Sequence, residues 1–174
     1  MHLMEVLVMI TADEIINLMG LKPLFPEGGY YVETYRSPMV LDGRQINLEE
    51  GDVRELFSAI YYLLAGRRVS RLHRLRSDEI YHLYLGGPLR MLLLYPDGIG
   101  EVITLGVDLA IGQRPQVLVP AGVWQGSWLE GGVDFAFMGT TMAPAYNPDD
   151  FELAEREKMV YEYPQFEVII NRLT

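Results

Sequence analysis

Cysteine is absent from this chain of 174 residues, which excludes a disulfide framework. Long apolar runs are absent as well. Hydrophobic residues make up 49% of the sequence, but no stretch is long and continuous enough to span a bilayer. The first ten residues lack the basic region and the small-residue cleavage site of a signal peptide. These absences predict a globular, cytoplasmic protein that makes no membrane contact.

Positive charge is scarce too. The chain has 14 Lys and Arg residues and 24 Asp and Glu residues, which gives a formal net charge of -10. No overall positive field therefore attracts nucleic acid. The one basic stretch, GRRVSRLHRLR, distributes its arginines over both faces of an expected strand. This distribution favours solvated or barrel-rim charges over anion capture at a pocket mouth. We therefore expect no nucleic-acid partner.

The order of the sequence patterns predicts a mainly β protein, with a single domain over residues 1–174. Thr11 and Glu14 have the spacing of a capping box and Gly20 is a stop signal, so residues 11–19 are expected to form a short helix. Short runs of Tyr, Val, Leu and Ile between turn sequences predict an antiparallel barrel or sandwich over residues 30–142. The stretch NPDDFELAEREKM predicts a helix within a C-terminal helical segment over residues 149–172.

Histidine is rare, with three in the chain, and one of them opens a motif. His73 and Leu75 lie two apart on an expected strand, so their side chains share a face, and Glu79 follows across the turn RSD. This spacing, completed by Gly86, resembles the first cupin motif, H-x-H-x-x-x-E followed by six residues and a glycine. Leu75 stands at the second histidine place. The segment PAGVWQ resembles the second motif, P-x-G-x-x-H, with Gln125 at the histidine place.

Four stretches in the right order narrow the resemblance. FPEGGYYVETYRS, HRLRSDEIYHLYLGGPL, PQVLVPAGVWQGSWL and TMAPAYNPDDFELA are similar to the uncharacterised cupin 5 (DUF985) family. The resemblance implies a cupin-type double-stranded β-helix, a jelly-roll barrel, with a short N-terminal helix and C-terminal helices. It also implies a dimer, but no established reaction.

A required metal is not expected. Cupin metal sites combine imidazoles with a carboxylate, because borderline divalent ions favour neutral nitrogen donors in a fixed geometry. Here Leu75 and Gln125 occupy two of the ligand places, so the site is expected to work without a cofactor. If a divalent metal is bound, its ligands would be His73, Glu79 and Gln125.

A proton-transfer site is the preferred hypothesis. A histidine inside an apolar barrel, beside a carboxylate that orients it, has what a general base requires. Cupin-type sugar epimerases use such a pair with a tyrosine opposite, and the resemblance assigns the catalytic roles to His73 and Glu79. The other candidate ligand-binding residues are Gln125, His82, Tyr81, Tyr31, Tyr35, Leu75 and Leu83. Strand alternation turns His82 away from Glu79 unless a bulge intervenes.

Two further assignments concern residues around these motifs. Glu27, in the sequence PEGG, either caps a turn or points into the barrel mouth, and the turn is the preferred interpretation. Trp124 is expected to face away from Gln125, and both it and Trp128 are expected to pack under a helix or at a dimer contact.

Three functions stay open on this evidence. The first is a binder of a small polar metabolite, such as a sugar, nucleotide sugar or keto acid, or an epimerase- or isomerase-type enzyme acting on it without a metal. The second is a metal-dependent cupin enzyme, a dioxygenase or isomerase, with an irregular ligand set. The third is a non-catalytic ligand sensor. In each case the aromatic segment YYVETYRS, which can pair across a two-fold axis, predicts a homodimer.

Overall fold

The computed structural model describes residues 10–43 and 53–174. The helices and strands are, in chain order, α1 (Ala12–Met19), β1 (Lys22–Pro23), β2 (Tyr30–Arg36), β3 (Val40–Asp42), β4 (Val53–Glu55), β5 (Ser58–Ala65), β6 (Val69–Arg74), β7 (Asp78–Gly86), β8 (Leu89–Leu94), β9 (Gly100–Leu105), η2 (Leu109–Ile111), β10 (Gln116–Val119), β11 (Trp124–Leu129), β12 (Phe135–Ala143), η3 (Pro148–Asp150), β13 (Glu152–Leu153), α2 (Arg156–Glu162), η4 (Pro164–Phe166) and α3 (Glu167–Leu173).

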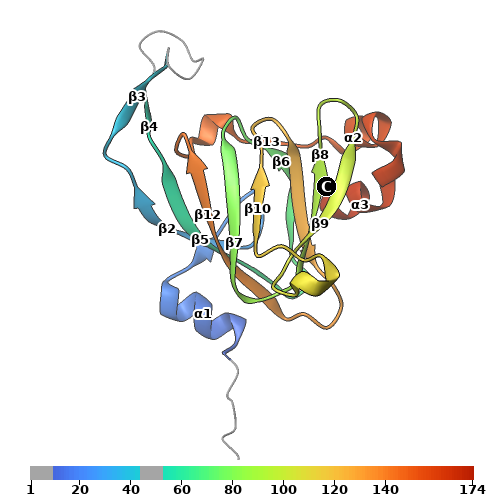
Figure 1. Cartoon of the computed structure of the whole chain (residues 1–174), viewed down its shortest axis with the longest axis horizontal. Helices are drawn as coiled ribbons and strands as arrows, with labels where there is room; N and C mark the ends of the chain where they lie inside the picture. The colour runs from blue at the N-terminus through green and yellow to red at the C-terminus, as the bar shows by residue number, and fades with distance from the viewer. Residues whose placement is uncertain (1–9, 44–52) are drawn as a thin grey trace, which may run out of the picture.

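Two antiparallel sheets make up most of the structure (Figure 1). The first has the strand order β1-β2-β5-β12-β7-β10, and the second has the order β13-β6-β11-β8-β9. β3 and β4 pair separately as a two-stranded ribbon that extends away from the sheets. The expected mainly β fold is therefore confirmed. The single-domain prediction also covers residues 1–9 and 44–52, which lie outside the described residues, and it stays a prediction.

The inner core fills the space between the two sheets, and β8 shows why its sequence is apolar throughout. Leu89, Met91 and Leu93 alternate toward the inner core, where they join inward-facing residues of the first sheet such as Tyr81. Leu92 and its outward-facing neighbours belong to a second cluster under the C-terminal helices. Because both faces of β8 are covered, its sequence is a continuous apolar run rather than an alternating one.

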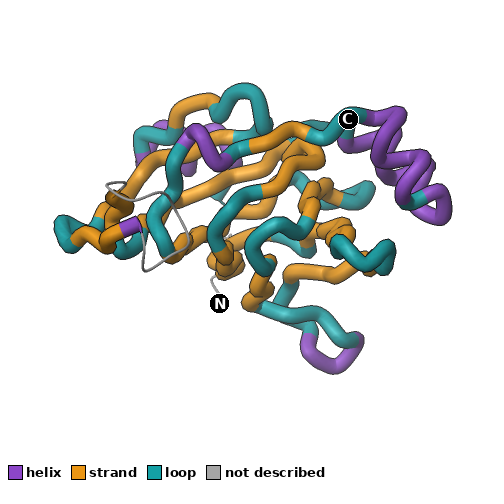
Figure 2. Tube along the Cα trace, turned by 90° about the horizontal axis from the view of Figure 1, so that it is seen from above, coloured by secondary structure: helices purple, strands orange, loops and turns teal. Residues whose placement is uncertain are grey.

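The helices pack on the outer faces of the sheets. α1 begins after Thr11, whose side chain and that of Glu14 form the expected capping box, and it buries Ile15 against the first sheet. α2 and α3 pack on the second sheet over both tryptophans, as expected for these indoles. The contact includes Trp124, Trp128, Met159, Ile170 and Leu173. Figure 2 shows these C-terminal helices together at one side of the molecule. Among the described residues, no helix is long and apolar enough to cross a membrane.

The helix predicted from NPDDFELAEREKM begins later than expected, at Arg156. Asn147 accepts a hydrogen bond from the backbone of Asp149 and starts only the short η3. The next residues then pair as β13 with Arg74 and His73 of β6. The open edge of β6 takes up this backbone, which makes the first half of the segment extended. One consequence is that Phe151 is brought to the ring of His73.

Candidate functional site

A pocket opens between the sheets near the start of β7. Its lining residues come from the loop before β2, from strands β2, β5, β7 and β12, from the turn between β6 and β7, and from the segment after β12. They are Leu24, Phe25, Pro26, Glu27, Tyr31, Glu33, Ser58, Ile60, Leu75, Glu79, Thr140, Met142, Tyr146 and Phe151. Its volume is about 80 Å³. Since a water needs roughly 10–15 Å³ by the same measure, the pocket has room for several waters or for a small metabolite.

Glu79 is the most buried charged residue in this lining, with 6% of its surface exposed. Strand alternation along β7 turns it into the space between the sheets. Its Oε2 accepts a hydrogen bond from Nε2 of Gln125 at 2.8 Å and one from the hydroxyl of Tyr81 at 3.2 Å. Burial raises the pKa of Glu79, and the carboxylate of Glu27 raises it further, while His73, Gln125 and Thr140 act in the opposite direction.

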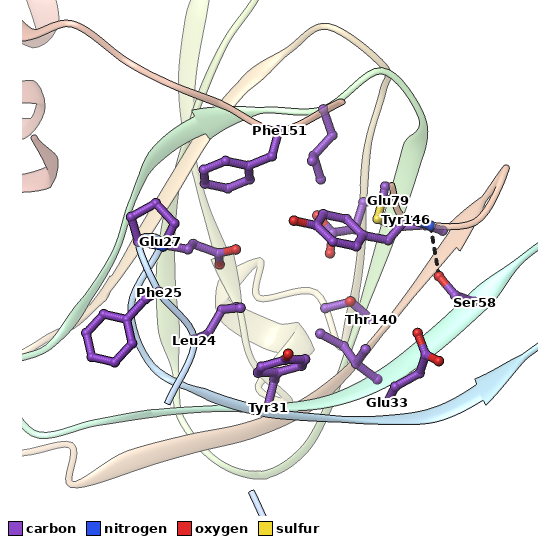
Figure 3. A pocket seen from close by; sticks show the side chains of 14 residues that line it. Leu24, Phe25, Glu27, Tyr31, Glu33, Ser58, Glu79, Thr140, Tyr146 and Phe151 are labelled. Atoms are coloured by element: carbon purple, nitrogen blue, oxygen red, sulfur yellow. Dashed lines mark hydrogen bonds between the residues drawn. The ribbon is translucent and has the colours of Figure 1, made fainter. Parts of the chain in front are cut away.

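Glu27 faces the same pocket from the loop between β1 and β2, as Figure 3 shows. Its Oε1 accepts a hydrogen bond from the hydroxyl of Ser70 at 2.8 Å, and its backbone carbonyl accepts one from the N–H of Arg71. These two bonds to β6 fix the loop so that the carboxylate lines the pocket. This corrects the preferred assignment of Glu27 to the turn alone, because the turn conformation is supplied by Gly28 and Gly29, both at positive φ.

His73 lies behind this lining, with 1% of its surface exposed. Its Nδ1 is 2.6 Å from the carbonyl oxygen of Arg71, and because a carbonyl can only accept, Nδ1 carries the hydrogen. Its Nε2 lies 3.9 Å from Oε2 of Glu27, and its ring stacks on Phe151. The prediction that His73 itself lines an open cavity is therefore wrong. Its ring is packed under Phe151, and it interacts with Glu79 through charge.

Gln125 comes from β11, where it is the direct neighbour of His73 on β6. It is 1% exposed, so the structure places it behind the pocket lining as well. Its amide nitrogen binds Glu79, while its Oε1 is buried without a hydrogen-bond partner among the described residues. His73, Glu79 and Gln125 thus converge from three strands, as expected, but of the three only Glu79 reaches the pocket lining.

Some of the residues predicted to form the pocket wall line the pocket, and others do not. Tyr31 and Leu75 line the pocket, and the buried Tyr81 lies beside it through its hydrogen bond to Glu79. Leu83 also faces inward and packs on the inner core, but it lies farther along β7 and is not part of the lining.

Tyr35 and His82 are not brought to the pocket. The pairing of β2 with β5 shifts register between Glu33 and Tyr35, and this irregularity turns Tyr35 outward, where it stacks on Phe57 with 47% of its surface exposed. His82 alternates away from Glu79 on β7 and pairs with Gln116 on the outer face of the sheet. Both placements correct the prediction that these side chains bind ligand.

Tyr146 is the main pocket residue that the sequence analysis missed. It follows β12, and its backbone N–H donates to the hydroxyl of Ser58 while its carbonyl accepts from Arg36. Its side chain reaches into the pocket beside Glu79 (Figure 3). Burial raises the pKa of Tyr146, as do the nearby groups Glu27, Tyr31 and Glu79. The only sequence signal was its position in TMAPAYNPDDFELA, one of the four stretches of the family resemblance.

The residues present do not fit the metal that cupin motifs imply. Leu75 has no ligand atom, and Gln125 turns its amide nitrogen, a donor group, toward Glu79. Oε2 of Glu79 already accepts two hydrogen bonds. Within residues 10–43 and 53–174, no group of three His, Cys, Asp or Glu side chains is arranged to hold a metal ion.

Comparison with known proteins agrees with this description. The family described as "Cupin_5: Cupin superfamily (DUF985)" matches residues 13–154. The chain is 33% identical over 109 residues to the uncharacterized protein YML079W of Saccharomyces cerevisiae, a match that spans 59% of this chain and 54% of the yeast protein. The chain thus matches about half the length of that relative.

Two solved structures are similar over nearly their whole length. Protein SO0799 from Shewanella oneidensis has 36% sequence identity and a TM-score of 0.84, with 95% of this chain and 98% of that chain covered. A hypothetical protein from Leishmania major has 28% identity and a TM-score of 0.85, with 95% and 99% covered. Oxalate decarboxylase from Bacillus subtilis, at 12% identity and a TM-score of 0.53, covers 90% of this chain with 37% of its own and shows the shared cupin fold alone.

Proposed function

This chain belongs to the Cupin_5 (DUF985) family of the cupin superfamily, and we propose that the pocket between its sheets binds a small polar metabolite. In this proposal the pocket residues transfer a proton to and from the metabolite without a metal. In this proposal Glu79 removes a proton from a carbon next to a carbonyl group. Glu27 delivers one from the other side. The reaction class is that of an isomerase or epimerase.

One observation carries the proposal: two carboxylates from different parts of the chain face one small cavity. Glu27 lines it from the loop before β2, and Glu79 lines it from β7. The side chain of Tyr146, which follows β12, lies beside Glu79 (Figure 3). A reaction that takes a proton from one face of a carbon and returns one to the other needs two such groups.

The protonation properties of Glu79 suit this role. Its raised pKa, caused first by burial and then by Glu27, brings the carboxyl group closer to the pH at which an acid–base catalyst works best. When the substrate C–H bond breaks, the proton passes to Glu79 and the electron pair forms an enolate. Glu27, after taking a proton from solvent, then gives it to the carbon, and loss of the proton from Glu79 to solvent restores both groups.

His73 is a positioning residue in this scheme, which replaces the His73 and Glu79 pair expected from the sequence. The bond from its Nδ1 to the carbonyl of Arg71 fixes the ring, and its Nε2 faces Glu27 at 3.9 Å. From this position His73 favours the ionised form of Glu79 without contacting substrate.

The lining disfavours an anionic ligand such as a nucleotide sugar or a keto acid. The charged side chains in the described lining are Glu27, Glu33 and Glu79, with no Lys or Arg among them. A diphosphate or carboxylate group would therefore meet negative charge without a basic partner.

Deuterium uptake from D₂O tests the proposal. Dihydroxyacetone, erythrulose and fructose are incubated with EDTA-dialysed protein, and the loss of C–H signals beside the carbonyl is followed by proton NMR. We expect exchange with at least one of these ketoses, slowed about 100-fold or more by Glu79→Gln because a general base is removed. Glu130→Gln, at an exposed ion pair with Arg90, is the matched control and should exchange like the wild type. Exchange with none of the compounds, or exchange restored only by added metal, contradicts the proposal.

A further inference from the structure

The walls of the pocket combine carboxylates with aromatic rings. Four lining residues have aromatic rings, Phe25, Tyr31, Tyr146 and Phe151, and Glu27 and Glu79 belong to the same lining. In Figure 3 these rings surround the carboxylates of the two glutamates. Aromatic faces carry partial negative charge, so rings and carboxylates favour the same kind of ligand.

The described lining of the pocket contains three carboxylates and no Lys or Arg. Glu33 at the mouth is paired with Arg36 at 2.8 Å. Glu79 accepts hydrogen bonds from the neutral groups of Gln125 and Tyr81, and Glu27 accepts one from the hydroxyl of Ser70. Nε2 of His73, behind the lining, lies 3.9 Å from Oε2 of Glu27, so one imidazole serves two carboxylates.

The carboxylates of Glu27 and Glu79 also act on three tyrosines near the pocket. Burial raises the pKa of Tyr62, of Tyr81 and of Tyr146, and in each case the carboxylates of Glu27 and Glu79 add to the effect. Burying carboxylates without compensation is costly, so a positive charge entering this space would be strongly stabilised.

We propose that the natural ligand of this pocket is a small organic cation, whose ammonium group lies between Glu27 and Glu79 with the rings of Tyr31 and Tyr146 as walls. This inference specifies the ligand of the proposed function. It rests on that function only in assuming that this pocket is the ligand site. The substrate class would then be an amine-bearing polar metabolite, for example an amino sugar or an amino ketone.

The aromatic lining favours an organic ammonium group over a metal ion. A metal needs several ligand atoms in a fixed geometry, and the described His, Cys, Asp and Glu residues form no such group. An ammonium group with methyl or methylene substituents instead makes cation–π contacts and excludes water from the rings.

Binding of a charged probe and its neutral isostere provides the test. Choline and 3,3-dimethylbutan-1-ol have the same shape and differ in charge, and their affinities are compared by isothermal titration calorimetry at low salt. Ethanolamine serves as a second, primary-ammonium probe. We expect choline or ethanolamine to bind at least about tenfold more tightly than the neutral alcohol. Equal affinity for choline and the alcohol, or binding of Mn²⁺ or Zn²⁺ that excludes choline, would overturn the inference.

Variants locate the binding to this pocket. Glu79→Gln and Glu27→Gln should each weaken choline binding about tenfold, whereas Glu130→Gln at the exposed ion pair should leave it unchanged. Tyr146→Leu should weaken it more than Tyr146→Phe, which keeps the ring. Circular dichroism and melting temperature establish that each variant is folded, and a tenfold loss in Glu130→Gln would contradict the site.

The two proposals fail separately. If choline binds with the expected charge preference but no compound exchanges deuterium, the pocket is a cation-binding site and the proton-transfer function is wrong. If uncharged ketoses exchange and the two isosteres bind equally, the function stands and the cationic ligand is wrong.

Discussion

At the scale of single residues, the environment of Glu79 has a consequence for stability. Burial raises the pKa of this carboxyl in the folded protein above its ordinary value of 4.5. Between these two values the folded protein holds a proton that the unfolded chain has released. The free energy of unfolding therefore falls as the pH rises through this window, and below it Glu79 contributes no pH dependence.

Glu79→Gln should remove this pH dependence. The difference in melting temperature, variant minus wild type, should increase in favour of the variant as the pH rises above 4.5, because only the wild type must ionise a buried group. For a chain of this length each kcal/mol corresponds to about 2–4 °C. Differential scanning calorimetry over this pH range, with Glu130→Gln as the exposed control, measures it. A constant difference across the range would contradict the assignment of a raised pKa.

Local sequence patterns fix some of the site residues but not others. Alternation along β7 correctly predicts that Glu79, Tyr81 and Leu83 face inward, because a period of two holds along a regular strand. The irregularity between Glu33 and Tyr35 breaks that period on β2, and nothing in YYVETYRS marks it. Tyr146 depends on bonds to residues 88 and 110 positions away in the sequence, which no local pattern contains.

At the scale of elements, the loop between β1 and β2 is the part of the fold that positions Glu27. Its carboxylate is held on β6 by Ser70, and the chain passes so close to β6 at Gly28 that an added Cβ would overlap the carbonyl oxygen of Val69. Gly28 also has a φ of 113°, where an L side chain is strained. The glycines of PEGG thus allow the approach that brings Glu27 into the pocket.

Gly28→Ala should destabilise the protein by roughly 3 kcal/mol, because the loop must both adopt a strained backbone and move away from β6. Gly66→Ala is the matched control, since Gly66 has a φ of 61° but open space around its Cβ position, and it should cost only about 1 kcal/mol. Urea denaturation gives both values. Equal losses in the two variants would show that the contact with Val69 has no part in the stability of the loop.

The distinction between local sequence signals and non-local contacts explains how much of the fold could be predicted. The strands, α1 and the barrel architecture follow from hydrophobic alternation, capping and the two cupin motifs, which are local signals. The mistaken start of the C-terminal helix has a non-local cause. Acidic residues after Asn147 suit a helix N-terminus, but Glu152 and Leu153 pair with the edge of β6 instead. Tertiary pairing overrides local propensity at this point.

At the scale of the whole molecule, the outer surface of the first sheet is only partly covered. α1 packs over Tyr30, Val32 and the neighbouring part of β5. Beyond this helix, large apolar side chains on both flanks of the sheet are about half exposed, Tyr35 at 47% and Tyr84 at 51%. On the β2 side, β1 pairs only with Tyr30 and Tyr31, so within the described residues the rest of that strand edge has no strand neighbour.

We expect a homodimer in which the β2 edges of two chains meet, because an open strand edge next to an exposed aromatic residue favours pairing across a two-fold axis. Light scattering after size exclusion, at about 10 μM protein, should give twice the chain mass. Tyr35→Asp should shift the protein to monomer by placing charge at this edge. Tyr84→Asp adds the same charge on the opposite flank of the same sheet and should leave the dimer intact. A monomeric wild type contradicts the dimer, and dissociation by Tyr84→Asp alone would move the interface to the other flank, around β7 and β10.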